Sequence, residues 1–482
     1  MNMTDALPQE TAADVIAQRF AAQEARALAL RTSTADERIA RLRRLQSALL
    51  NRRPDLYAAF ARDFRKPAVE VDLTELLPVV EEIHTAIRKL RKWMRPRRVA
   101  PTLTTIGTSA RVTYQGKGRC LIIGPWNYPV ATLIGPLVSA IAAGNAVILK
   151  PSEFTPAVNA VLAAAIAEAF DAAEVTMITG GVATAQALLA CPFDHMFFTG
   201  SPAVGKLVMA AAAQHLASVT LELGSKSPVI VDASADLDRA AELVMWGKLL
   251  NAGQSCIAPD TLFVHRGVRD AFLGRCKNII AARYGTTDAA IADSADLARM
   301  IHERHASRVA ALIDDARSLG AKTVAGGGYD VGQRFVAPTL LTNIAPAARI
   351  ADEEIFGPVL PVFEFDRIDD VVAAINARPK PLALYLWSTC SANIQLVMSE
   401  TSSGSVVVNH CMQQYAHPGL PFGGVNNSGI GNSHGFHGFK AFSHERAMLS
   451  GSRLLLVKAF FPPYTPLKRR LVGSLIEWLR KS

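Results

Sequence analysis

One cysteine, Cys256, lies in a polar, glycine-containing stretch, NAGQSCIA at residues 251–258. Structural cysteines usually have apolar neighbours, whereas Gly253, Gln254 and Ser255 precede this thiol. A cysteine nucleophile needs a lowered pKa or a nearby base, and hydrogen-bond donors for the oxyanion that its attack creates. The stretch therefore indicates a turn that presents a nucleophile, and a buried core thiol is the alternative.

Two further polar side chains meet the needs of such a nucleophile. Glu222, in LELGSKSP, ends an apolar strand, where a carboxylate is either solvated or used as a base. Asn127, in GPWNYP, lies between Pro125 and Pro129, which stiffen the loop so that the amide becomes a fixed donor. Ordinary turn chemistry is the alternative for the asparagine. Together with Cys256, these residues are the candidate catalytic set.

The usual dinucleotide fingerprint, G-x-G-x-x-G, does not follow the first expected strand, because IIGPWNYP at 122–129 has one glycine. A second strand-to-helix junction, FFTGSPAVG at 197–205, places Gly200 and Ser201 at the start of a helix. Free N–H groups and the helix dipole make such a start a phosphate site. A serine is also an ordinary N-cap, so both interpretations stay open.

Two other polar pairs have less specific patterns. Lys150 and Glu153 follow a strand three residues apart, which suits either a ribose or a surface ion pair. His302 and His305 share one face of an expected helix. A third ligand is not near them in the sequence, so we expect both at the surface and predict no metal site.

The elements that must position these residues form two strand–helix series. Residues 10–95 have helical periodicity, with Thr34 and Glu37 at capping-box spacing, and residues 96–116 are extended in character. Short apolar strands then alternate with helices, which is typical of βαβ units and parallel sheets. The expected strands are 119–125, 145–151, 175–180, 195–201 and 218–224 in the first series, and 227–233, 261–267, 321–327, 359–365, 382–388 and 404–410 in the second.

Composition indicates a globular chain of two or three domains. The chain has 482 residues, of which 50% are hydrophobic and 19% charged. Its six cysteines are scattered without a C-x-x-C pair, which excludes a zinc ribbon and favours a reducing compartment, the cytoplasm. Residues 1–20 contain early acids and lack a long apolar core, so we expect no signal peptide.

The net charge of +9 includes basic runs at 92–101 and 466–482. Neither run is interleaved with aromatic residues in the manner of a nucleic-acid platform, so we expect no nucleic-acid partner. In the last run, leucines recur every four residues among basic side chains, which predicts an amphipathic helix. This helix is shorter than the ~20 apolar residues that span a bilayer. We expect it to cover its own dimer or active-site rim, with peripheral membrane contact as the alternative. The leucines and basic residues are Leu467, Leu471, Leu475 and Leu479 with Lys468, Arg469, Arg470, Arg480 and Lys481.

Seven short motifs occur in a fixed order, and together they resemble the NAD(P)-dependent aldehyde dehydrogenase superfamily over residues 10–450. Any one motif is common, but seven in order are specific. The segment 434–449 and the short N-terminus resemble the class 3 branch, which includes fatty and aromatic (coniferyl-type) aldehyde dehydrogenases. The motifs are GPWNYP, NAVILKPSE, FTGSPAVGK, LELGSKSP, NAGQSCIAPD, EEIFGPVLP and LPFGGVNNSGIG.

The resemblance implies a role for each candidate residue. Cys256 matches the family's nucleophile and Glu222 its general base. Asn127 matches the side-chain half of the oxyanion hole, and the Cys256 backbone N–H is the other half. The cofactor positions implied are Lys150 and Glu153 at the adenosine ribose, Gly200, Ser201, Val204 and Gly205 at the pyrophosphate-side turn, Glu354 and Phe356 at the nicotinamide ribose, and Trp126 beside them.

The implied fold class is α/β, with two doubly wound open-sheet domains and a small β oligomerisation arm. The implied activity is oxidation of a medium- or long-chain aliphatic or an aromatic aldehyde to the acid, through a thiohemiacetal and a thioester, by a homodimer. The cofactor is NAD or NADP, with NAD slightly favoured because Glu153 accepts ribose hydroxyls and repels a 2′-phosphate. The expected segments are 1–100 and 118–222 for the cofactor, 223–405 for catalysis, 101–117 and 406–450 for the arm, and 451–482 for a basic tail.

Two other function classes stay open: a CoA-acylating or reductive enzyme on this fold, and a non-enzymatic basic membrane binder. Some positions also depart from the family pattern. Ser225 replaces the glycine of ELGGK and could restrict Glu222. His410, Gln414 and Asn426 are unusual near the expected substrate entrance, and they put the substrate class in question more than the chemistry.

Overall fold

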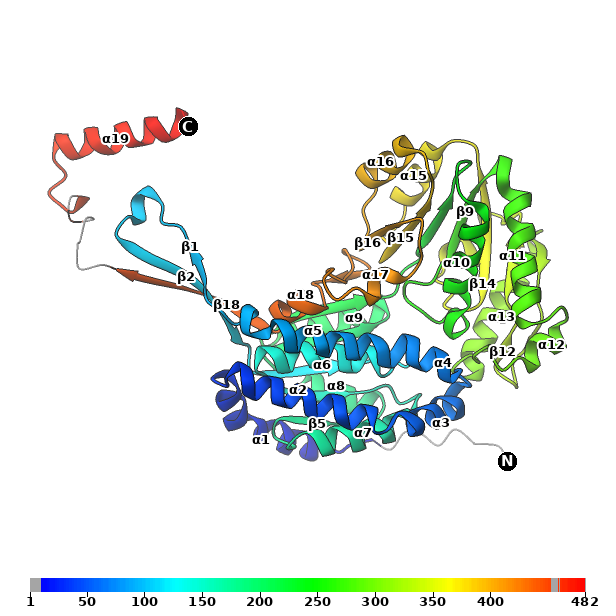
Figure 1. Ribbon diagram of the computed structural model, residues 1–482, viewed down its shortest axis with the longest axis horizontal. Helices are drawn as coiled ribbons and strands as arrows, with labels where there is room; N and C mark the ends of the chain where they lie inside the picture. The colour runs from blue at the N-terminus through cyan, green and yellow to red at the C-terminus, as the bar shows by residue number, and fades with distance from the viewer. Residues whose placement is uncertain (1–9, 452–457, 459, 482) are drawn as a thin grey trace.

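The computed structural model describes residues 10–451, 458 and 460–481 of the 482-residue chain. Two α/β bodies lie side by side, and a narrow β arm and a C-terminal helix project from the first body (Figure 1). The first body holds the N-terminal helices and the first sheet, and the second body holds the green-to-yellow part of the chain. Part of the segment tested for a signal peptide, residues 1–9, lies outside the described residues.

The first sheet has six strands in the order β17-β7-β6-β3-β4-β5. Five strands are parallel, and β17 pairs with β7 in the antiparallel sense. The chain enters at β3, proceeds to β4 and β5, and then crosses to β6 and β7 on the other side. The order therefore reverses between β3 and β6, where open α/β sheets bind ligands. The strands are β3 (Arg119–Ile123), β4 (Ala146–Lys150), β5 (Val175–Met177), β6 (His195–Gly200), β7 (Ser218–Leu223) and β17 (Gly429–Ile430).

Helices cover both faces of this sheet because strand side chains alternate between the two faces. Cys120 and Ile122 of β3 join a core cluster with the helices from α2 to α7. Leu121 and Ile123 join another cluster with residues of α1, α8 and α9. The sheet is thus doubly wound. The helices are α1 (Ala13–Arg31), α2 (Ala35–Leu50), α3 (Arg53–Phe64), α4 (Ala68–Val71), α5 (Leu77–Trp93), α6 (Ala131–Ala143), α7 (Pro156–Ala169), α8 (Val182–Leu189) and α9 (Pro202–Ala213).

The N-terminal helices include a break in regular helical geometry beside the catalytic loops. The predicted capping box of Thr34 and Glu37 begins α2. Between α4 and α5 the backbone forms a π-helix, η1 (Asp72–Leu76), a form that is frequent at functional sites. Segment 66–76, which holds α4 and η1, packs its buried polar side chains towards the loops after β3 and α10.

The second sheet has seven strands in the order β10-β13-β14-β9-β8-β15-β16, and β10 is antiparallel to its neighbour. All predicted strands of both series are present, and the α/β fold class is confirmed. Strand β13 was not predicted, because its apolar run is only TLL. The strands are β8 (Pro228–Val231), β9 (Thr261–His265), β10 (Lys322–Ala325), β13 (Thr339–Thr342), β14 (Val359–Phe365), β15 (Ala383–Trp387) and β16 (Ser405–Val408), with a separate pair, β11 (Tyr329–Asp330) and β12 (Phe335–Val336).

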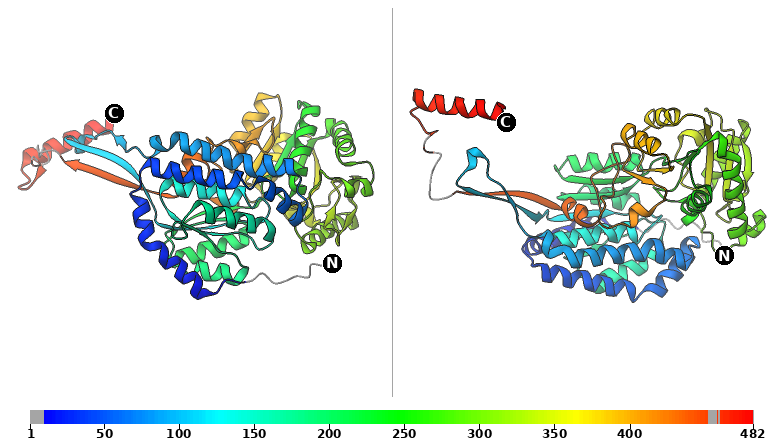
Figure 2. Two further views of the ribbon diagram at one scale, coloured as in Figure 1. Left: turned by 60° about the horizontal axis from the view of Figure 1, so that its bottom comes forward. Right: turned by 45° about the horizontal axis from the view of Figure 1, so that its top comes forward.

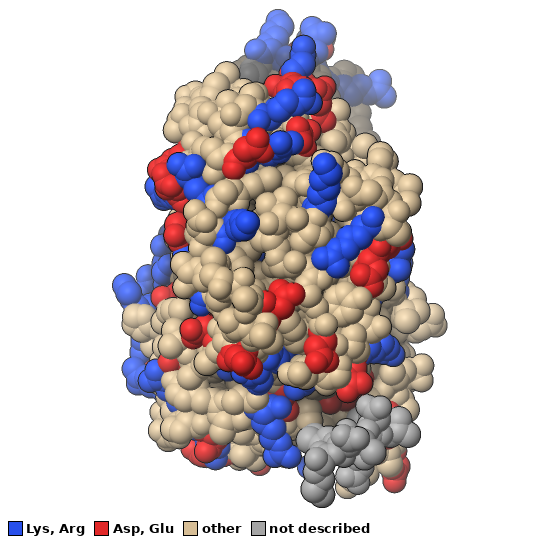
Figure 3. Space-filling view, turned by 90° about the vertical axis from the view of Figure 1, so that its right-hand side faces the viewer, with Lys and Arg blue, Asp and Glu red and all other residues tan. Residues whose placement is uncertain are grey.

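Helices also surround the second sheet, and one apolar core cluster joins them to its strands. The helices are α10 (Leu237–Leu249), α11 (Arg269–Tyr284), α12 (Asp288–Asp293), α13 (Glu303–Ser318), α14 (Arg349–Asp352), α15 (Ile368–Asn376), α16 (Ser391–Glu400) and α17 (Gln413–Ala416), with short helices η3 (Leu250–Gly253) and η4 (Arg266–Val268). Helix α18 (Gly435–Ala441) packs instead on α5 and α6 of the first body, and the short helix η2 (Leu103–Thr105) lies between residues 99 and 108. On the face of this body in Figure 3, acidic and basic side chains are interspersed.

The arm is a three-stranded antiparallel sheet of β1 (Arg97–Val99), β2 (Thr108–Gly116) and β18 (Ser443–Gly451). Strand β18 pairs with β2 along its whole length, from Ser443 opposite Gly116 to Gly451 opposite Thr108. The arm therefore joins segments more than 300 residues apart. Its limits differ from the expected 101–117 and 406–450, because β1 lies in the arm and β16 in the second sheet.

The C-terminal tail contains the predicted helix, α19 (Pro466–Lys481), and none of its residues is buried. The arm and α19 stand clear of the two bodies in every view (Figures 1 and 2). Among the described residues, we find no helix that is both long and apolar enough to cross a membrane. Residues 452–457, 459 and 482 of the tail lie outside the described residues.

Candidate active site

Cys256 lies on a turn, as the sequence predicts, three residues after an unusual left-handed stretch. The values of φ are 51° at Asn251, 51° at Ala252 and 73° at Gly253, a region that side-chain-bearing residues adopt at a cost. Only glycine fits the last position, because an added Cβ would lie 2.3 Å from the carbonyl oxygen of Gly357. The turn leaves Cys256 partly exposed while both residues before it are buried.

Asn127 is tied to this turn through its side-chain amide. Its Nδ2 donates to the carbonyl oxygen of Gln254 at 3.1 Å. The Asn251 Nδ2 donates to the carbonyl oxygens of Asn127 at 2.8 Å and Gln254 at 3.2 Å. The loop after β3 and the cysteine loop are therefore one hydrogen-bonded unit. An amide carries two N–H donors, so the bond to Gln254 anchors Asn127 and leaves a second N–H for an oxyanion.

Gln254 is the centre of this unit, although the sequence analysis assigned it no role. Its side chain is fully buried. Its Nε2 donates to the carbonyl oxygens of Asn251 at 2.9 Å and Arg299 at 3.0 Å, and its Oε1 accepts from the Ile301 N–H at 3.0 Å. A buried amide whose polar atoms are paired in this way rigidifies its surroundings. The sequence signal for this role of Gln254 was its position two residues before Cys256.

Glu222 belongs to β7, where it lies opposite Gly429 of β17. Its Oε1 accepts a hydrogen bond from the Ser433 hydroxyl at 3.1 Å. In the described part of the chain, Oε2 has no hydrogen-bond partner and no solvent exposure. Burial raises the pKa of Glu222 well above its usual range, which the Ser433 bond only partly offsets. Burial therefore favours the protonated form of this carboxyl.

Ser225 does not restrict Glu222 by direct contact. Its hydroxyl accepts from the Leu382 N–H at 2.7 Å, next to the start of β15. Its own N–H donates to Oε1 of Glu354 at 3.0 Å. The Ser225 side chain therefore bonds to the segment just before β15, and the expected loss of backbone freedom beside Glu222 stays a prediction.

The Cys256 thiol lies in an environment that opposes ionisation. Burial raises its pKa to about 12, and the nearby carboxylates of Glu354 and Glu222 raise it further in the same direction. Burial also raises the pKa of Glu354 to about 8, with Asp260 as the next cause. Desolvation therefore favours the neutral form of the Cys256 thiol and of the Glu354 carboxyl.

A cluster of buried charged side chains, which the sequence did not indicate, lies next to Glu354. Lys226 forms an ion pair with Asp260, and the second Asp260 oxygen accepts the Ile355 N–H at 2.9 Å. Lys248 is fully buried at the end of α10, and burial lowers its pKa to about 8. These contacts hold the segment that carries Glu354 against the loop of Ser225.

The residues matched to the adenosine ribose form an ion pair at the end of β4. Lys150 Nζ lies 3.2 Å from Glu153 Oε2, and the side chains are 5% and 20% exposed. The pair lies at the carboxyl edge of the first sheet, near its switch point. A cation and a carboxylate that are both partly shielded from water suit ribose hydroxyls, because each offers a strong hydrogen-bonding group at a fixed place.

The turn after β6 has no room for a side chain at either of its two glycines, Gly200 and Gly205. An added Cβ at Gly200 would lie 2.5 Å from the Phe198 ring, and one at Gly205 would lie 2.6 Å from Leu223. Ser201 is the N-cap of α9, and its hydroxyl accepts from the Val204 N–H at 3.4 Å. The free N–H groups at this helix start fit the phosphates of a dinucleotide.

Trp126 and Phe356 meet in one aromatic group with His305. The Trp126 ring centroid is 5.3 Å from that of Phe356 and 5.5 Å from that of His305. His305 Nε2 donates to the Phe356 carbonyl oxygen at 2.8 Å, and φ at Phe356 is 51°. The expectation of a surface position is wrong for His305, which is buried, because this bond draws it inwards. His302 caps α13 instead of sharing its face.

The remaining departures from the family pattern are accommodated around β15. The buried Gln414 donates from Nε2 to the Tyr385 hydroxyl at 3.0 Å, and that hydroxyl donates to the Ile257 carbonyl oxygen at 2.7 Å. Gln414 thus supports the residue after the nucleophile. Asn426 has φ of 56° and accepts from Lys380 Nζ at 3.0 Å. Asparagine tolerates this left-handed conformation better than most residues.

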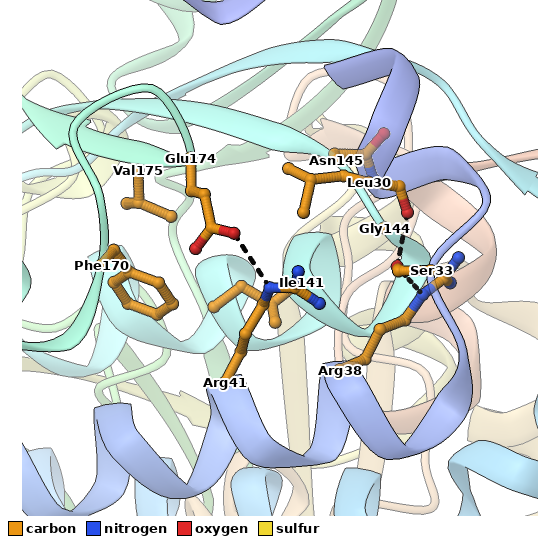
Figure 4. A pocket seen from close by; sticks show the side chains of 10 residues that line it. All are labelled: Leu30, Ser33, Arg38, Arg41, Ile141, Gly144, Asn145, Phe170, Glu174 and Val175. Carbon is orange, nitrogen blue, oxygen red and sulfur yellow. Dashed lines mark hydrogen bonds and ion pairs between the residues drawn. The ribbon is translucent and has the colours of Figure 1, made fainter. Parts of the chain in front are cut away.

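A separate small pocket between α2 and α6 contains none of the candidate residues. In Figure 4 its polar side chains point towards one another: Arg41 Nε lies 3.1 Å from Glu174 Oε1, and Arg38 Nε donates to the Ser33 hydroxyl at 3.0 Å. These pairs make the pocket part of the packing between helices. Within the residues that the structure describes, no three His, Cys, Asp or Glu side chains are grouped to hold a metal ion.

Comparison with known proteins agrees with this geometry. The model of the aldehyde dehydrogenase family matches residues 2–448. The chain belongs to the aldehyde dehydrogenase family. The family resemblance read from the seven motifs is thus confirmed, and so is the assignment as an NAD(P)-dependent oxidoreductase of aldehydes.

Three aldehyde dehydrogenases illustrate the similarity. A probable coniferyl aldehyde dehydrogenase of Pseudomonas aeruginosa is 40% identical over 95% of this chain and 95% of its own length. Aldehyde dehydrogenase family 3 member A2 of Macaca fascicularis is 40% identical over 86% of this chain and 83% of its own. The substrate-bound structure of Staphylococcus aureus AldH superimposes with a TM-score of 0.91 at 37% identity, covering 96% of this chain and 99% of that one.

We expect the thiol of Cys256 to be poorly reactive at neutral pH when no cofactor is present. Since its pKa lies near 12, the thiolate fraction should rise about tenfold per pH unit. The rate of alkylation by iodoacetamide, followed for the Cys256 peptide by mass spectrometry, should therefore rise continuously from pH 7 to 9. The urea-unfolded protein is the control, because its thiols should approach a plateau near pH 9. A folded-state rate that is flat over this range would contradict the assigned environment.

Proposed function

We propose that this aldehyde dehydrogenase oxidises medium- or long-chain aliphatic or aromatic aldehydes to carboxylic acids through a thioester on Cys256. One observation carries the proposal: the Asn127 amide and the cysteine turn are hydrogen-bonded together through Gln254 and Asn251. The coniferyl and family 3 names of the relatives support the substrate classes.

In the proposed reaction, the Cys256 thiol loses its proton to solvent water, and the thiolate sulfur attacks the aldehyde carbon. The second N–H of the Asn127 amide and the Cys256 backbone N–H stabilise the resulting oxyanion, and each such donor is worth roughly 3 kcal/mol. A bound NAD(P)+ would supply the hydride acceptor. Lys150 and Glu153 would hold its adenosine ribose, the turn from Gly200 to Gly205 its phosphates, and Glu354 and Phe356 its nicotinamide ribose.

Loss of hydride leaves a thioester on Cys256, and Glu222 serves its hydrolysis. Neutral water is a poor nucleophile, and general-base help is worth roughly 10²–10⁴-fold. The raised pKa of Glu222 supports this role, since a carboxylate whose conjugate acid is weak takes a proton from water more readily once ionised. Its second oxygen, which has no partner among the described residues, is the one that would accept the water proton.

A CoA-acylating or reductive enzyme on the same fold is the second candidate. Such an enzyme needs no hydrolytic base, so the position of Glu222 favours hydrolysis. A purely structural membrane binder would need neither the paired amides of Asn127 and Asn251 nor the strained turn before Cys256. The cytoplasm is the proposed compartment, which the six free cysteines support.

Replacement of Glu222 by glutamine should separate the two half-reactions. The amide keeps the shape but cannot take a proton, so the thioester should accumulate. We expect a pre-steady-state burst of NAD(P)H near one per active site, then steady turnover slowed about 10²-fold or more, measured by absorbance with a panel of aldehydes. An acyl group on Cys256 should be visible by mass spectrometry.

Cys256→Ala is the control for this experiment, and it should fold, bind cofactor and give neither burst nor turnover. Unchanged steady-state turnover in Glu222→Gln would remove Glu222 from the mechanism. Faster turnover of the wild-type enzyme when CoA is added would support the acyl-transfer reading instead.

NAD+ should be used at least as well as NADP+, because the Glu153 carboxylate repels a 2′-phosphate and Lys150 offsets this only in part. Glu153→Gln should raise the NADP+/NAD+ ratio of kcat/KM about tenfold by removing that repulsion. Glu81→Gln, an exposed carboxylate on α5, is the charge-matched control and should leave the ratio unchanged. A wild-type preference for NADP+ above tenfold would contradict the proposal.

We further propose that the enzyme is a homodimer built on the β arm, and that α19 covers apolar surface of the second copy or its active-site rim. Exposed apolar side chains on the arm support this, among them Ile106 and Leu449 at 54% and 62% exposure. The helix α19 exposes Leu467, Leu471 and Trp478, with basic residues around them. Peripheral contact with an anionic membrane is the other outcome that such a helix allows.

Deletion of 466–482 should lower activity or reduce the oligomer size, because it uncovers the surface that α19 shields. Val472→Glu tests the apolar face, and Gly473→Glu is its control, since position 473 lies about one turn from Arg469 and Glu477 on the polar side of the helix. Light scattering, turnover and sedimentation with anionic vesicles measure the three outcomes. Vesicle binding lost only in Val472→Glu would assign the helix to a membrane. No effect of the deletion on any measurement would show that the tail is inert.

A further inference from the structure

Glu70, on the short helix α4, is a buried carboxylate that the reaction described above does not use. It is 9% exposed, and its Oε2 accepts a hydrogen bond from the backbone N–H of Asn251 at 2.9 Å. The two residues are 181 positions apart in the chain, and the bond joins the first body to the loop that carries the nucleophile. Burial raises the pKa of Glu70 to about 7, and Lys66 partly offsets this.

Asn251 is the first of the left-handed residues before Cys256, and it is completely buried. A buried backbone N–H without an acceptor costs about 1–3 kcal/mol. Asparagine tolerates the left-handed conformation better than most residues, but the next residue, Ala252, is also left-handed and persists there only where its surroundings hold it. The Glu70 oxygen supplies the acceptor that this N–H needs.

The side chain of Asn251 passes this restraint to the catalytic groups. Its Nδ2 donates to the carbonyl oxygens of Asn127 and Gln254, and the Gln254 carbonyl oxygen also accepts from the Asn127 amide at 3.1 Å. Only one residue separates Gln254 from Cys256. The path from Glu70 to both halves of the oxyanion hole therefore consists of short hydrogen bonds between buried groups.

We propose that Glu70 is a positioning residue, which fixes the left-handed turn at Asn251 and thereby sets the Asn127 amide and the Cys256 N–H to receive the oxyanion. This rests on the proposed function of those two groups. Glu70 does not touch substrate, and its effect is on acylation. The neighbouring Lys66 has a different task, because its Nζ pairs with Glu75 at 2.8 Å and faces the Tyr128 ring at 4.1 Å.

Three variants at position 70 test separately whether the effect depends on the hydrogen-bond acceptor, on the charge or on the length of the side chain. Glu70→Ala removes the acceptor. Glu70→Asp keeps the charge on a side chain one methylene shorter, which does not reach the Asn251 N–H. Glu70→Gln keeps the length and a carbonyl oxygen that accepts the same bond. Glu81→Gln is the control, since it makes the same chemical change at an exposed position on α5.

We expect the Ala and Asp variants to slow the NAD(P)H burst about 10–100-fold, because misplacement of a reacting group by ~1 Å costs up to about 10²-fold. The cofactor Kd, from fluorescence titration, should stay within about twofold, since the ribose and phosphate contacts lie elsewhere. Glu70→Gln should restore the burst to within about threefold of the wild type. This split between burst rate and cofactor affinity distinguishes positioning from a general loss of structure.

Amide hydrogen exchange of the peptide covering 250–256 provides a readout that needs no activity. Exchange should be faster in Glu70→Ala and Glu70→Asp and unchanged in Glu70→Gln and Glu81→Gln. If the Ala variant does not fold, the Asp and Gln variants decide the matter. A wild-type enzyme that forms no NAD(P)H with any aldehyde, even in a single turnover, would overturn the proposed function while the exchange experiment still tests the restraint. A burst within twofold of wild type in Glu70→Asp, or slow exchange in that variant, would overturn the role of Glu70.

Discussion

The catalytic site depends on one constraint, the left-handed turn of Asn251, Ala252 and Gly253. It is unfavourable alone, and buried hydrogen bonds from three directions hold it: the Glu70 carboxylate, the Gln254 amide and the loop of Asn127. Because these partners come from α4, the turn itself and the loop after β3, the site forms only when both α/β bodies are folded and docked. The position of Cys256 therefore depends on the packing between the two bodies.

The second physical theme is burial of ionisable groups. The pKa of Cys256 is raised to about 12 and that of Glu354 to about 8, and that of Glu222 lies well above its usual range. All three shifts have desolvation as their first cause, so each favours the neutral form. Because the thiolate form of Cys256 is disfavoured, the thiol should react slowly with oxidants and alkylating agents.

The topology explains why the cofactor residues converge without the usual glycine fingerprint. Strands β3 and β6 are neighbours, but the chain reaches them in separate passes, so the loop of Asn127 and the turn of Gly200 meet at the switch point of the sheet. The ion pair of Lys150 and Glu153 lies one strand further along. In the proposed cofactor site, three loops would therefore share the work that one glycine-rich loop performs in other dinucleotide-binding sheets.

The sequence by itself determined the α/β class, nearly all strands and the turn at Cys256, because apolar periodicity and glycine placement are local properties. It missed β13, whose apolar run is too short to stand out. It also gave no sign that Glu70 would reach Asn251, that His305 would be buried against Phe356, or that Ser225 would bond to Leu382. Only the tertiary structure decided these contacts, since each joins segments 51 to 181 residues apart, and burial, which sets the pKa values, exists only after those segments pack.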